Sequence, residues 1–215
     1  MVCCGGDLVS QGVKKIETMV LGSHNSWSYL RPAKWYKRPF AWMARCQRVD
    51  IRQQYEMGVR CFDMRLRVNN DGNLYIAHGL CEYQYTIQCI SSDLNWLDQK
   101  GDCYVRVLHE ARYKWQYTEA SRGSFGYICA IMAKEFKNIR FFGGQNLYNW
   151  ELDFNFCEGK DEVDEPTVDE RHASVSKPRL IDDWWPWLYA WVHNEAIKIT
   201  GTEKDILLVD YIDMP

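Results

Sequence analysis

Short apolar runs alternate with segments of helical periodicity along this chain. Runs rich in Val, Ile, Leu and Phe predict β-strands, and apolar residues spaced by three or four positions predict helices. The predicted strands are 18–22, 59–68, 74–77, 103–110, 139–142, 147–154 and 206–212. The predicted helices are 50–57, 126–136 and 182–198. This alternation predicts an α/β fold built on a parallel sheet.

Two of the predicted helices carry features that define an end or a face. Helix 50–57 is followed by Gly58, and glycine readily closes a helix because it adopts the left-handed conformation. Helix 182–198 has one apolar side, formed by Trp184, Trp187, Leu188 and Trp191. A helix packs its apolar side on the rest of the fold, so we expect these side chains to lie against the sheet.

Strand 59–68 is the most informative segment, because side chains alternate between the two faces of a strand. One face is apolar and carries Phe62, Met64, Leu66 and Val68. The other face carries Cys61, Asp63, Arg65 and Arg67. A strand of a parallel sheet is normally buried and apolar on both faces. Charges on one face fit a barrel strand near its open end, so the strand predicts a site at the C-terminal mouth of a barrel.

Composition excludes several classes of protein. The chain has 215 residues, of which 47% are hydrophobic and 26% charged, as is usual for a globular domain. The formal net charge is −3, so we do not expect nucleic acid as a partner. No apolar run approaches the roughly 18 residues of a membrane span, and the first residues, MVCCGGDLVSQG, do not resemble a signal peptide.

The domain organisation follows from one unusual segment. Residues 157–178 are crowded with acidic side chains and lack apolar periodicity, which indicates a surface loop. Too few residues follow this segment to form a second core. We therefore expect a single domain over 1–215, and we expect the protein to be a monomer.

Cysteine usage bears on the compartment. The nine cysteines form an odd set without a CxxC pair, so a disulfide scaffold is not expected. Most of these thiols are expected to pack as small apolar groups in a reducing compartment, which favours the cytoplasm. No metal site is predicted from spacing either, because His24, His78, His109, His172 and His193 show no zinc pattern such as HExxH.

Candidate chemistry gathers at the ends of the predicted strands. His24 follows strand 18–22, Asp63 and Arg65 lie on the charged face of the next strand, and His78 follows strand 74–77. A single histidine at a strand end is more often structural than catalytic. Two histidines and an arginine together can cleave a phosphodiester without a metal: one imidazole takes a proton, the other donates one, and the guanidinium binds the phosphate.

Three sequence blocks carry a resemblance to a known family. LGSHNSWSYL (21–30), MGVRCFDMRLRV (57–68) and LYIAHG (74–79) resemble the X region of phosphatidylinositol-specific phospholipase C, in the PLC-like phosphodiesterase superfamily. CYVRVLHEA (103–111) resembles the next catalytic strand of that family, and ILLVDYI (206–212) resembles the closing strand. The resemblance implies a single distorted, short (β/α) TIM-type barrel. It also implies two-step cleavage of an inositol phospholipid through a cyclic inositol phosphate.

The resemblance implies a role for each matching residue. His24 matches the general base, His78 the general acid and Arg65 the phosphate-binding arginine of the bacterial, metal-independent branch. Asp63 matches the acidic residue on the same strand, and Asp210 matches the carboxylate that orients the base. Independently of the family, a carboxylate on an otherwise apolar strand needs a partner, because burying it alone is costly.

One departure from the bacterial pattern opens the question of a metal. Asn25 stands where bacterial enzymes carry Asp, and Asn25, Asp63 and Glu110 match calcium ligands of the eukaryotic branch. The fourth ligand position is Arg65, whose charge would repel calcium. We therefore expect no cofactor, with calcium as the alternative. Asn25, Glu110 and Arg67 are also candidates for binding substrate or supporting the catalytic groups.

Segment 31–48 combines basic and aromatic residues, a composition that suits an anionic lipid surface. The resemblance places membrane-facing aromatic residues in this region, so we expect Trp35, Tyr36 and Trp42 to contact a phospholipid bilayer peripherally. A solvated segment whose rings pack inward is the alternative.

Three hypotheses of function remain. The first is a phosphodiesterase that cleaves an inositol phospholipid. The second keeps the mechanism but changes the phospholipid or glycolipid headgroup, because the residues that contact inositol cannot be assigned here. The third is an inactive module that binds a lipid or its headgroup. A hydrolase based on Cys81 and His78 lacks a third catalytic group.

Overall fold

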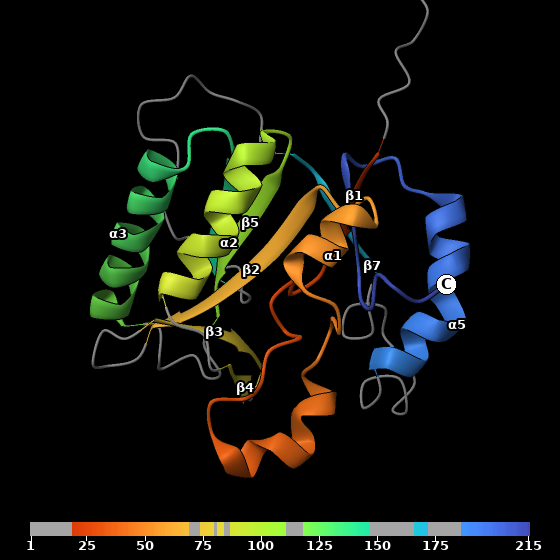
Figure 1. Cartoon of the computed structure of the whole chain (residues 1–215), viewed down its shortest axis with the longest axis horizontal. Coiled ribbons are helices and arrows are strands. Elements are labelled where there is room, and N and C mark those ends of the chain that lie inside the picture. Colours follow the sequence, from red (N-terminus) through yellow and green to blue (C-terminus); the bar gives the residue numbers. More distant parts are fainter. Residues whose placement is uncertain are drawn as a thin grey trace, which may run out of the picture.

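An eight-stranded, mostly parallel sheet forms the centre of the fold (Figure 1). The computed structural model describes residues 19–68, 74–79, 81–83, 87–110, 118–146, 166–171 and 186–215. The strands are β1 (Val20–Ser23), β2 (Cys61–Val68), β3 (Leu74–His78), β4 (Cys81–Glu82), β5 (Tyr104–His109), β6 (Arg140–Asn146), β7 (Val168–Arg171) and β8 (Ile206–Val209).

Parallel pairing links the strands in the order β6-β5-β2-β1-β8-β7. Strand β2 is long enough to pair with β3 as well as with β1 and β5. Its first six residues pair with β5 in parallel, and its last three pair with β3 in antiparallel orientation. Strand β4 extends this hairpin. The result is a curled half-barrel in the described residues, and the α/β fold predicted from the sequence is confirmed.

The helices are the 3-10 helix η1 (Trp35–Met43) and the α-helices α1 (Ile51–Glu56), α2 (Ile87–Lys100), α3 (Glu119–Glu135) and α5 (Pro186–Thr200). In the view of Figure 1, α2 and α3 lie to the left of the sheet and α5 lies to its right. Helix α1 begins at a capping box between Asp50 and Gln53. It is followed by Gly58 at φ +95°, as the sequence predicts. Thr118 caps α3 through the backbone amide of Ser121.

The two faces of β2 pack against different surroundings. Phe62, Met64 and Leu66 are fully buried in the main core. On the opposite face Cys61 packs with a small cluster of apolar residues, comprising Phe142, Ile206 and Leu208. This cluster fills the inside of the half-barrel at the amino ends of the strands. The charged residues farther along β2 therefore lie above an apolar floor, toward the carboxyl ends.

The cysteines are consistent with small core residues. Five of the described cysteines are buried: Cys46, Cys61, Cys81, Cys103 and Cys129. In Cys61 and Cys129 burial raises the thiol pKa well above its ordinary range, which keeps these groups neutral.

Within the described part of the chain, no helix combines the length and apolarity that crossing a bilayer requires.

Some predicted elements differ from the structure. The predicted loop 157–178 contains strand β7, which pairs with β8 in parallel. The sequence did not predict this strand because β7 lies at the edge of the sheet and carries charged side chains. Asp169 and Arg171 form an ion pair there and do not pack in a core. Residues 157–165 and 172–178 of that loop and the predicted strand 147–154 lie outside the described residues. Helix α2 was not predicted, although Ile90, Leu94 and Leu97 form its buried side.

The predicted apolar side of helix 182–198 is wrong. Trp187 and Trp191 are 38% and 60% exposed, whereas the buried residues of α5 are Pro186, Ala190, Asn194 and Ile197. Trp184 lies outside the described residues. The Asn194 amide donates to the carbonyl oxygens of Asp210 and Tyr211, at 2.7 and 3.1 Å. These bonds hold the side of the helix that carries Asn194 toward the backbone beyond β8, because the carbonyl groups there need donors.

Candidate functional site

His24 and Asp210 form a buried pair where β1 and β8 end. His24 follows β1, and its backbone amide donates to the carbonyl oxygen of Val209 at 2.9 Å. This bond extends the β1–β8 ladder by one step and brings the two side chains together. Nδ1 of His24 lies 2.6 Å from Oδ1 of Asp210. Both residues are at most 2% exposed, so the pair expected from the sequence forms in a site of low dielectric.

Asp63 is the centre of a network on β2. Its Oδ2 accepts from Nε of Arg65 at 2.8 Å and from the backbone amide of Asn25 at 3.0 Å. Nε2 of His24 lies 4.0 Å from the same oxygen. Arg106 of β5 approaches the other oxygen at 3.9 Å. Asp63 is fully buried, and its charge is balanced by these cationic and amide groups.

Asn25 owes its contact with Asp63 to an unusual backbone conformation. Its φ is +43°, in the left-handed region that asparagine tolerates better than most residues. The amide of the next residue, Ser26, donates to the Asp63 carbonyl oxygen at 2.8 Å. The turn after His24 is therefore fastened to β2 by two amide donors. In this structure Asn25 contributes through its backbone.

Arg65 lies between two carboxylates. Its Nε contacts Asp63, and its Nη1 lies 3.5 Å from Oε2 of Glu110, directly after β5. Burial lowers the pKa of the Arg65 guanidinium, but the charges of Asp63 and Glu110 outweigh that effect and raise it overall. The guanidinium is 4% exposed. It is a fixed positive charge at the mouth of the half-barrel.

Glu110 and Arg67 hold the corner that follows His78. The backbone amide of Gly79 donates to Oε1 of Glu110. Nη2 of Arg67 donates to the Gly79 carbonyl oxygen at 2.7 Å, and its Nε donates to the Glu110 carbonyl oxygen at 3.2 Å. Both residues thus position the turn that carries His78. Glu110 contacts the backbone of this turn and the side chain of Arg65.

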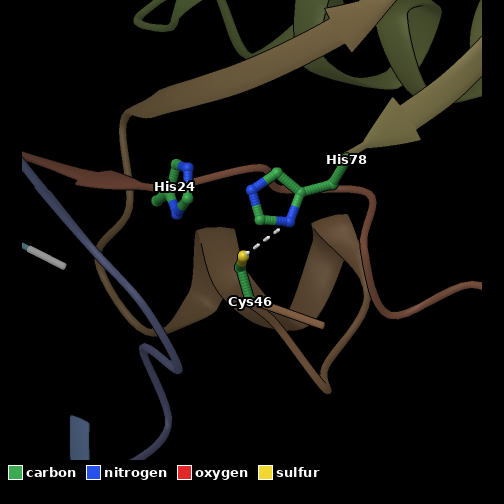
Figure 2. A group of neighbouring side chains, drawn as sticks. All are labelled: His24, Cys46 and His78. Atoms are coloured by element: carbon green, nitrogen blue, oxygen red, sulfur yellow. Dashed lines mark hydrogen bonds between the residues drawn. The ribbon is translucent and has the colours of Figure 1, made fainter. Parts of the chain in front are cut away.

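His78 faces His24 across the mouth (Figure 2). The ring centroids lie 5.2 Å apart and the planes meet at 85°. Nδ1 of His78 lies 2.9 Å from the carbonyl oxygen of Ala44 and 3.5 Å from Sγ of Cys46. A backbone carbonyl thus orients the His78 ring. In many other sites a side-chain carboxylate orients the histidine.

Sequence reasoning missed the segment 44–47, which lies beside both histidines. Ser28 Oγ accepts from the backbone amides of Cys46 and Gln47, each at 2.9 Å. The Gln47 amide donates to the carbonyl oxygens of His24 and Val209, at 3.1 and 3.0 Å. The segment is therefore clamped between the ends of β1 and β8. No local pattern signals this, because a lone cysteine in a loop has no characteristic spacing.

The aromatic side chains of η1 point outward. Trp35, Tyr36, Phe40 and Trp42 are 75%, 53%, 58% and 37% exposed. Ala41 of the same helix is buried and anchors it. Helix η1 stands at the lower edge of the molecule, beside β3 and β4 (Figure 1). Trp35, Tyr36 and Phe40 are therefore more exposed than buried and do not pack inward, whereas Trp42 is the least exposed of the four. Contact of these rings with lipid stays a prediction.

The site residues gather at the carboxyl ends of neighbouring strands. His24 follows β1, Asp63 and Arg65 lie on β2, Glu110 follows β5 and Asp210 follows β8. His78 reaches the same place from the end of β3. A base paired with a carboxylate, a second imidazole and a buried guanidinium can together move two protons and bind an anion. The predicted position at the C-terminal mouth is confirmed.

Comparisons with known proteins identify the fold. No model of a known protein family matches the chain, and no curated protein sequence matches it. Phosphatidylinositol-specific phospholipase C from Listeria monocytogenes aligns over 91% of this chain and 89% of its own, at 16% identity and a TM-score of 0.59. The Staphylococcus aureus enzyme aligns over 89% and 85%, at 16% identity and a TM-score of 0.52. This chain shares the fold of these bacterial enzymes, a distorted and short TIM-type barrel.

Proposed function

We propose that this protein is a phospholipase C-like phosphodiesterase that cleaves the glycerol–phosphate bond of an inositol phospholipid. The observation that carries the proposal is the pair of facing imidazoles, His24 and His78, with centroids 5.2 Å apart. Asp210 orients one of them, and the Arg65 guanidinium lies at the same mouth. The fold shared with bacterial phosphatidylinositol-specific phospholipases C supports the same assignment.

In the first step His24 acts as the general base. Its Nδ1–H donates to Asp210, which leaves Nε2 to take the proton of an inositol hydroxyl. The hydroxyl oxygen attacks the neighbouring phosphorus and forms a cyclic phosphodiester, while the bond from phosphorus to the glycerol oxygen breaks. Asp210 stabilises the imidazolium that forms, as the carboxylate does in other carboxylate–histidine pairs.

His78 acts as the general acid in the same step. It donates a proton to the departing glycerol oxygen, so diacylglycerol leaves as a neutral alcohol. The Ala44 carbonyl, 2.9 Å from Nδ1, holds the ring in place. In the second step the roles reverse. His78 takes a proton from water and the water oxygen attacks phosphorus, while the bond from phosphorus to the inositol oxygen of the ring breaks and His24 returns a proton to that oxygen.

Arg65 supplies the positive charge for the phosphate. Its guanidinium is buried and held by Asp63, so it needs no rearrangement as negative charge grows on the phosphate oxygens. Asp63 also lies 4.0 Å from Nε2 of His24 and favours the protonated ring. One carboxylate thus supports the base and positions the phosphate-binding cation.

We further propose that the reaction is metal-independent. The calcium donor set would be Asn25, Asp63 and Glu110, but Arg65 lies between the two carboxylates, 2.8 Å from one and 3.5 Å from the other. A calcium ion needs carboxylate oxygens at about 2.3–2.6 Å and cannot share them with a guanidinium. The buried amide of Asn25 makes no hydrogen bond in the described structure, which is the one feature that suits a ligand. The donor set as arranged does not fit calcium.

The exposed rings of η1 give the protein a surface for lipid. Trp35, Tyr36 and Trp42 are proposed to enter the interface of a phospholipid bilayer, with the basic residues of segment 31–48 near anionic headgroups. The substrate would then reach the mouth from the membrane, because η1 lies directly before the segment that holds Cys46 beside the histidines.

A phosphorus NMR time course on phosphatidylinositol vesicles tests the proposal, with chelator in one sample and calcium in another. A cyclic inositol phosphate signal in the chelator sample supports the metal-independent reaction. A signal only with calcium rejects that part of the proposal. No signal in either sample rejects the assigned substrate, and vesicle binding without turnover would then favour a lipid-binding module. His24→Ala should abolish the signal, whereas His193→Ala, at an exposed position on α5, should not.

A further inference from the structure

We propose that His24, Cys46 and His78 form a binding site for a soft divalent transition-metal ion of the Zn²⁺ class, which inhibits the protein reversibly. One ligand atom from each of the three residues lies within 4.8 Å of the other two. The binding follows from the geometry alone. The inhibition rests on the proposed function, because two of the ligands are the proposed acid and base.

The three side chains come from separate parts of the chain and point toward one another (Figure 2). His24 follows β1, His78 ends β3, and Cys46 lies in the segment after η1. His24 and Cys46 are each 1% exposed, whereas His78 is only partly buried. A metal ion could therefore enter from the side where substrate is proposed to bind.

The donor set is the one that zinc prefers. Two imidazole nitrogens and one thiolate sulfur match structural and catalytic zinc sites, where zinc–nitrogen bonds are about 2.0–2.1 Å and zinc–sulfur bonds about 2.3 Å. Those bond lengths place ligand atoms roughly 3.5 Å apart in a tetrahedron. Sγ of Cys46 already lies 3.5 Å from Nδ1 of His78. A movement of about 1 Å by the His24 and His78 rings would complete three of four ligand positions.

Neighbouring groups already hold His24 and Cys46 in place, as the ligands of a metal site need to be held. Asp210 accepts from Nδ1 of His24 at 2.6 Å, an arrangement that fixes the ring and leaves Nε2 to the metal. Nδ1 of His78, the nitrogen 3.5 Å from the Cys46 thiol, lies 2.9 Å from the Ala44 carbonyl oxygen, so it must give up this hydrogen bond to bind the metal. The backbone amide of Cys46 donates to Ser28, so the thiol is carried by a fastened backbone. The fourth position stays open for water or a phosphate oxygen.

The charge balance permits a divalent ion. Binding replaces the thiol proton of Cys46 with the metal and releases that proton to solvent. The thiolate and the Asp210 carboxylate then offset the two positive charges, while Asp63 lies 4.0 Å from Nε2 of His24. Arg65 opposes binding as the nearest cation on β2. Hard ions such as Mg²⁺ and Ca²⁺ prefer oxygen ligands and should not compete at this site.

A metal held here would stop acid–base catalysis. Both imidazoles would use their lone pairs for the metal, so neither could take a proton from a hydroxyl or from water. The inhibition should be reversed by a chelator, because no covalent bond to carbon forms. The site therefore predicts inhibition by Zn²⁺ where Mg²⁺ at the same concentration has no effect.

Cobalt spectroscopy tests the site without any enzyme assay. The reduced, metal-free full chain is titrated with Co²⁺, and absorption is recorded for thiolate–cobalt charge transfer in the near ultraviolet and for the visible bands of tetrahedral cobalt. We expect both. Cys46→Ser should remove the charge-transfer band, and His78→Gln should weaken binding by at least about tenfold. Circular dichroism of each variant checks that it is folded.

Other cysteines need matched controls. Cys89→Ser, at an exposed position on α2, and the double variant Cys3→Ser with Cys4→Ser should keep the wild-type cobalt spectrum. Absence of a charge-transfer band in the wild type, or a band that survives in folded Cys46→Ser, would overturn the site.

Activity measurements then separate this inference from the proposed function. If wild type cleaves phosphatidylinositol, Zn²⁺ should inhibit it, excess chelator should restore it, and Cys46→Ser should need at least about tenfold more Zn²⁺ for the same inhibition. Equal inhibition of both proteins would overturn the role of Cys46. A cobalt band in a chain without phosphodiesterase activity would support the metal site and reject the proposed function.

Discussion

Oδ2 of Asp63 lies 2.8 Å from Nε of Arg65 and 4.0 Å from Nε2 of His24, so one buried carboxylate adjoins two groups with different proposed roles. The same oxygen accepts the backbone amide of Asn25. The positions of Arg65 and His24 therefore both depend on Asp63. Substitutions at Arg65 and Asp63 are expected to be non-additive, because they belong to one network.

Arg65→Lys should lower kcat for phosphatidylinositol by about 10²-fold or more, since an ammonium cannot hold Asp63 and a phosphate with the planar geometry of a guanidinium. Steady-state kinetics on vesicles measure the change. Arg140→Lys, at an exposed position on β6, is the matched control and should retain wild-type kinetics. A rate within twofold of wild type for Arg65→Lys would remove Arg65 as the phosphate ligand.

Asp210→Asn should lower kcat by about 10²–10⁴-fold, because an amide cannot stabilise the His24 imidazolium. Thermal unfolding of the variant checks that the pair, not the fold, accounts for the loss. The control is Asp205→Asn, an exposed acidic residue directly before β8. If Asp210→Asn turned over at the wild-type rate, His24 could not be acting with a carboxylate partner.

Trp35→Ala should weaken binding to anionic vesicles by about tenfold, because this ring is 75% exposed and is proposed to enter the bilayer interface. Vesicle sedimentation measures the binding, and hydrolysis of a soluble short-chain substrate should be unchanged. Trp191→Ala on α5 is the matched control, with a ring that is 60% exposed. Equal losses for the two variants would contradict a specific role for η1.

Gly22→Ala should destabilise the fold by about 1–3 kcal/mol. A Cβ at this position of β1 would meet Cδ2 of Leu208 at 2.4 Å and Cβ of Cys61 at 3.1 Å, inside the apolar floor of the half-barrel. Urea unfolding measures the loss. Gly123→Ala in α3 is the control: no atom lies within 4 Å of the added methyl group, and alanine favours the helix. Equal stability of Gly22→Ala and wild type would contradict this packing.

Acid should destabilise the protein through His109. Burial, and then the charges of Arg67 and Arg122, lower the pKa of His109 to about 4, and its ring stacks on Phe125 at 4.8 Å. The unfolded state therefore binds the proton first, so stability falls as the pH drops from about 6.5 toward 4. Between pH 7 and pH 5, protonation linked to this residue should lower the free energy of unfolding by about 2 kcal/mol.

Urea unfolding of wild type and His109→Gln at both pH values measures that contribution. The variant should lose less stability on acidification, because it lacks the group that titrates. His193→Gln, whose histidine is exposed on α5, should lose as much as wild type. Identical losses in all three proteins would show that His109 does not govern the acid response.

Helix α5 shows where a sequence pattern misleads. Tryptophans spaced by three and four positions predict a buried side, yet Trp187 and Trp191 are exposed and Asn194 is buried. The buried side is set by carbonyl groups after β8, which accept from Asn194. Periodicity reports which residues share a side of a helix. It does not report whether the neighbouring element offers apolar surface or unsatisfied backbone groups.

The sequence by itself determined β2, the strand ends and the proposed catalytic groups. Alternation of side chains is a local property of an extended chain, so the charged face with Asp63 and Arg65 could be assigned without a structure. Placement of His24 and His78 directly after apolar runs likewise predicted a site at the strand ends, and a buried Asp210 required a partner.

Tertiary structure alone decided that Cys46 lies beside His78 and that Ala44 orients its ring. These contacts depend on Ser28, whose hydroxyl accepts from the backbone amides of Cys46 and Gln47, and on the Gln47 side chain, which donates to the Val209 carbonyl oxygen. The bonds join the ends of β1 and β8 to the segment after η1. No spacing along the chain encodes them, because each partner is distant in sequence. The proposed metal ligands His24, Cys46 and His78 therefore meet only in the folded chain.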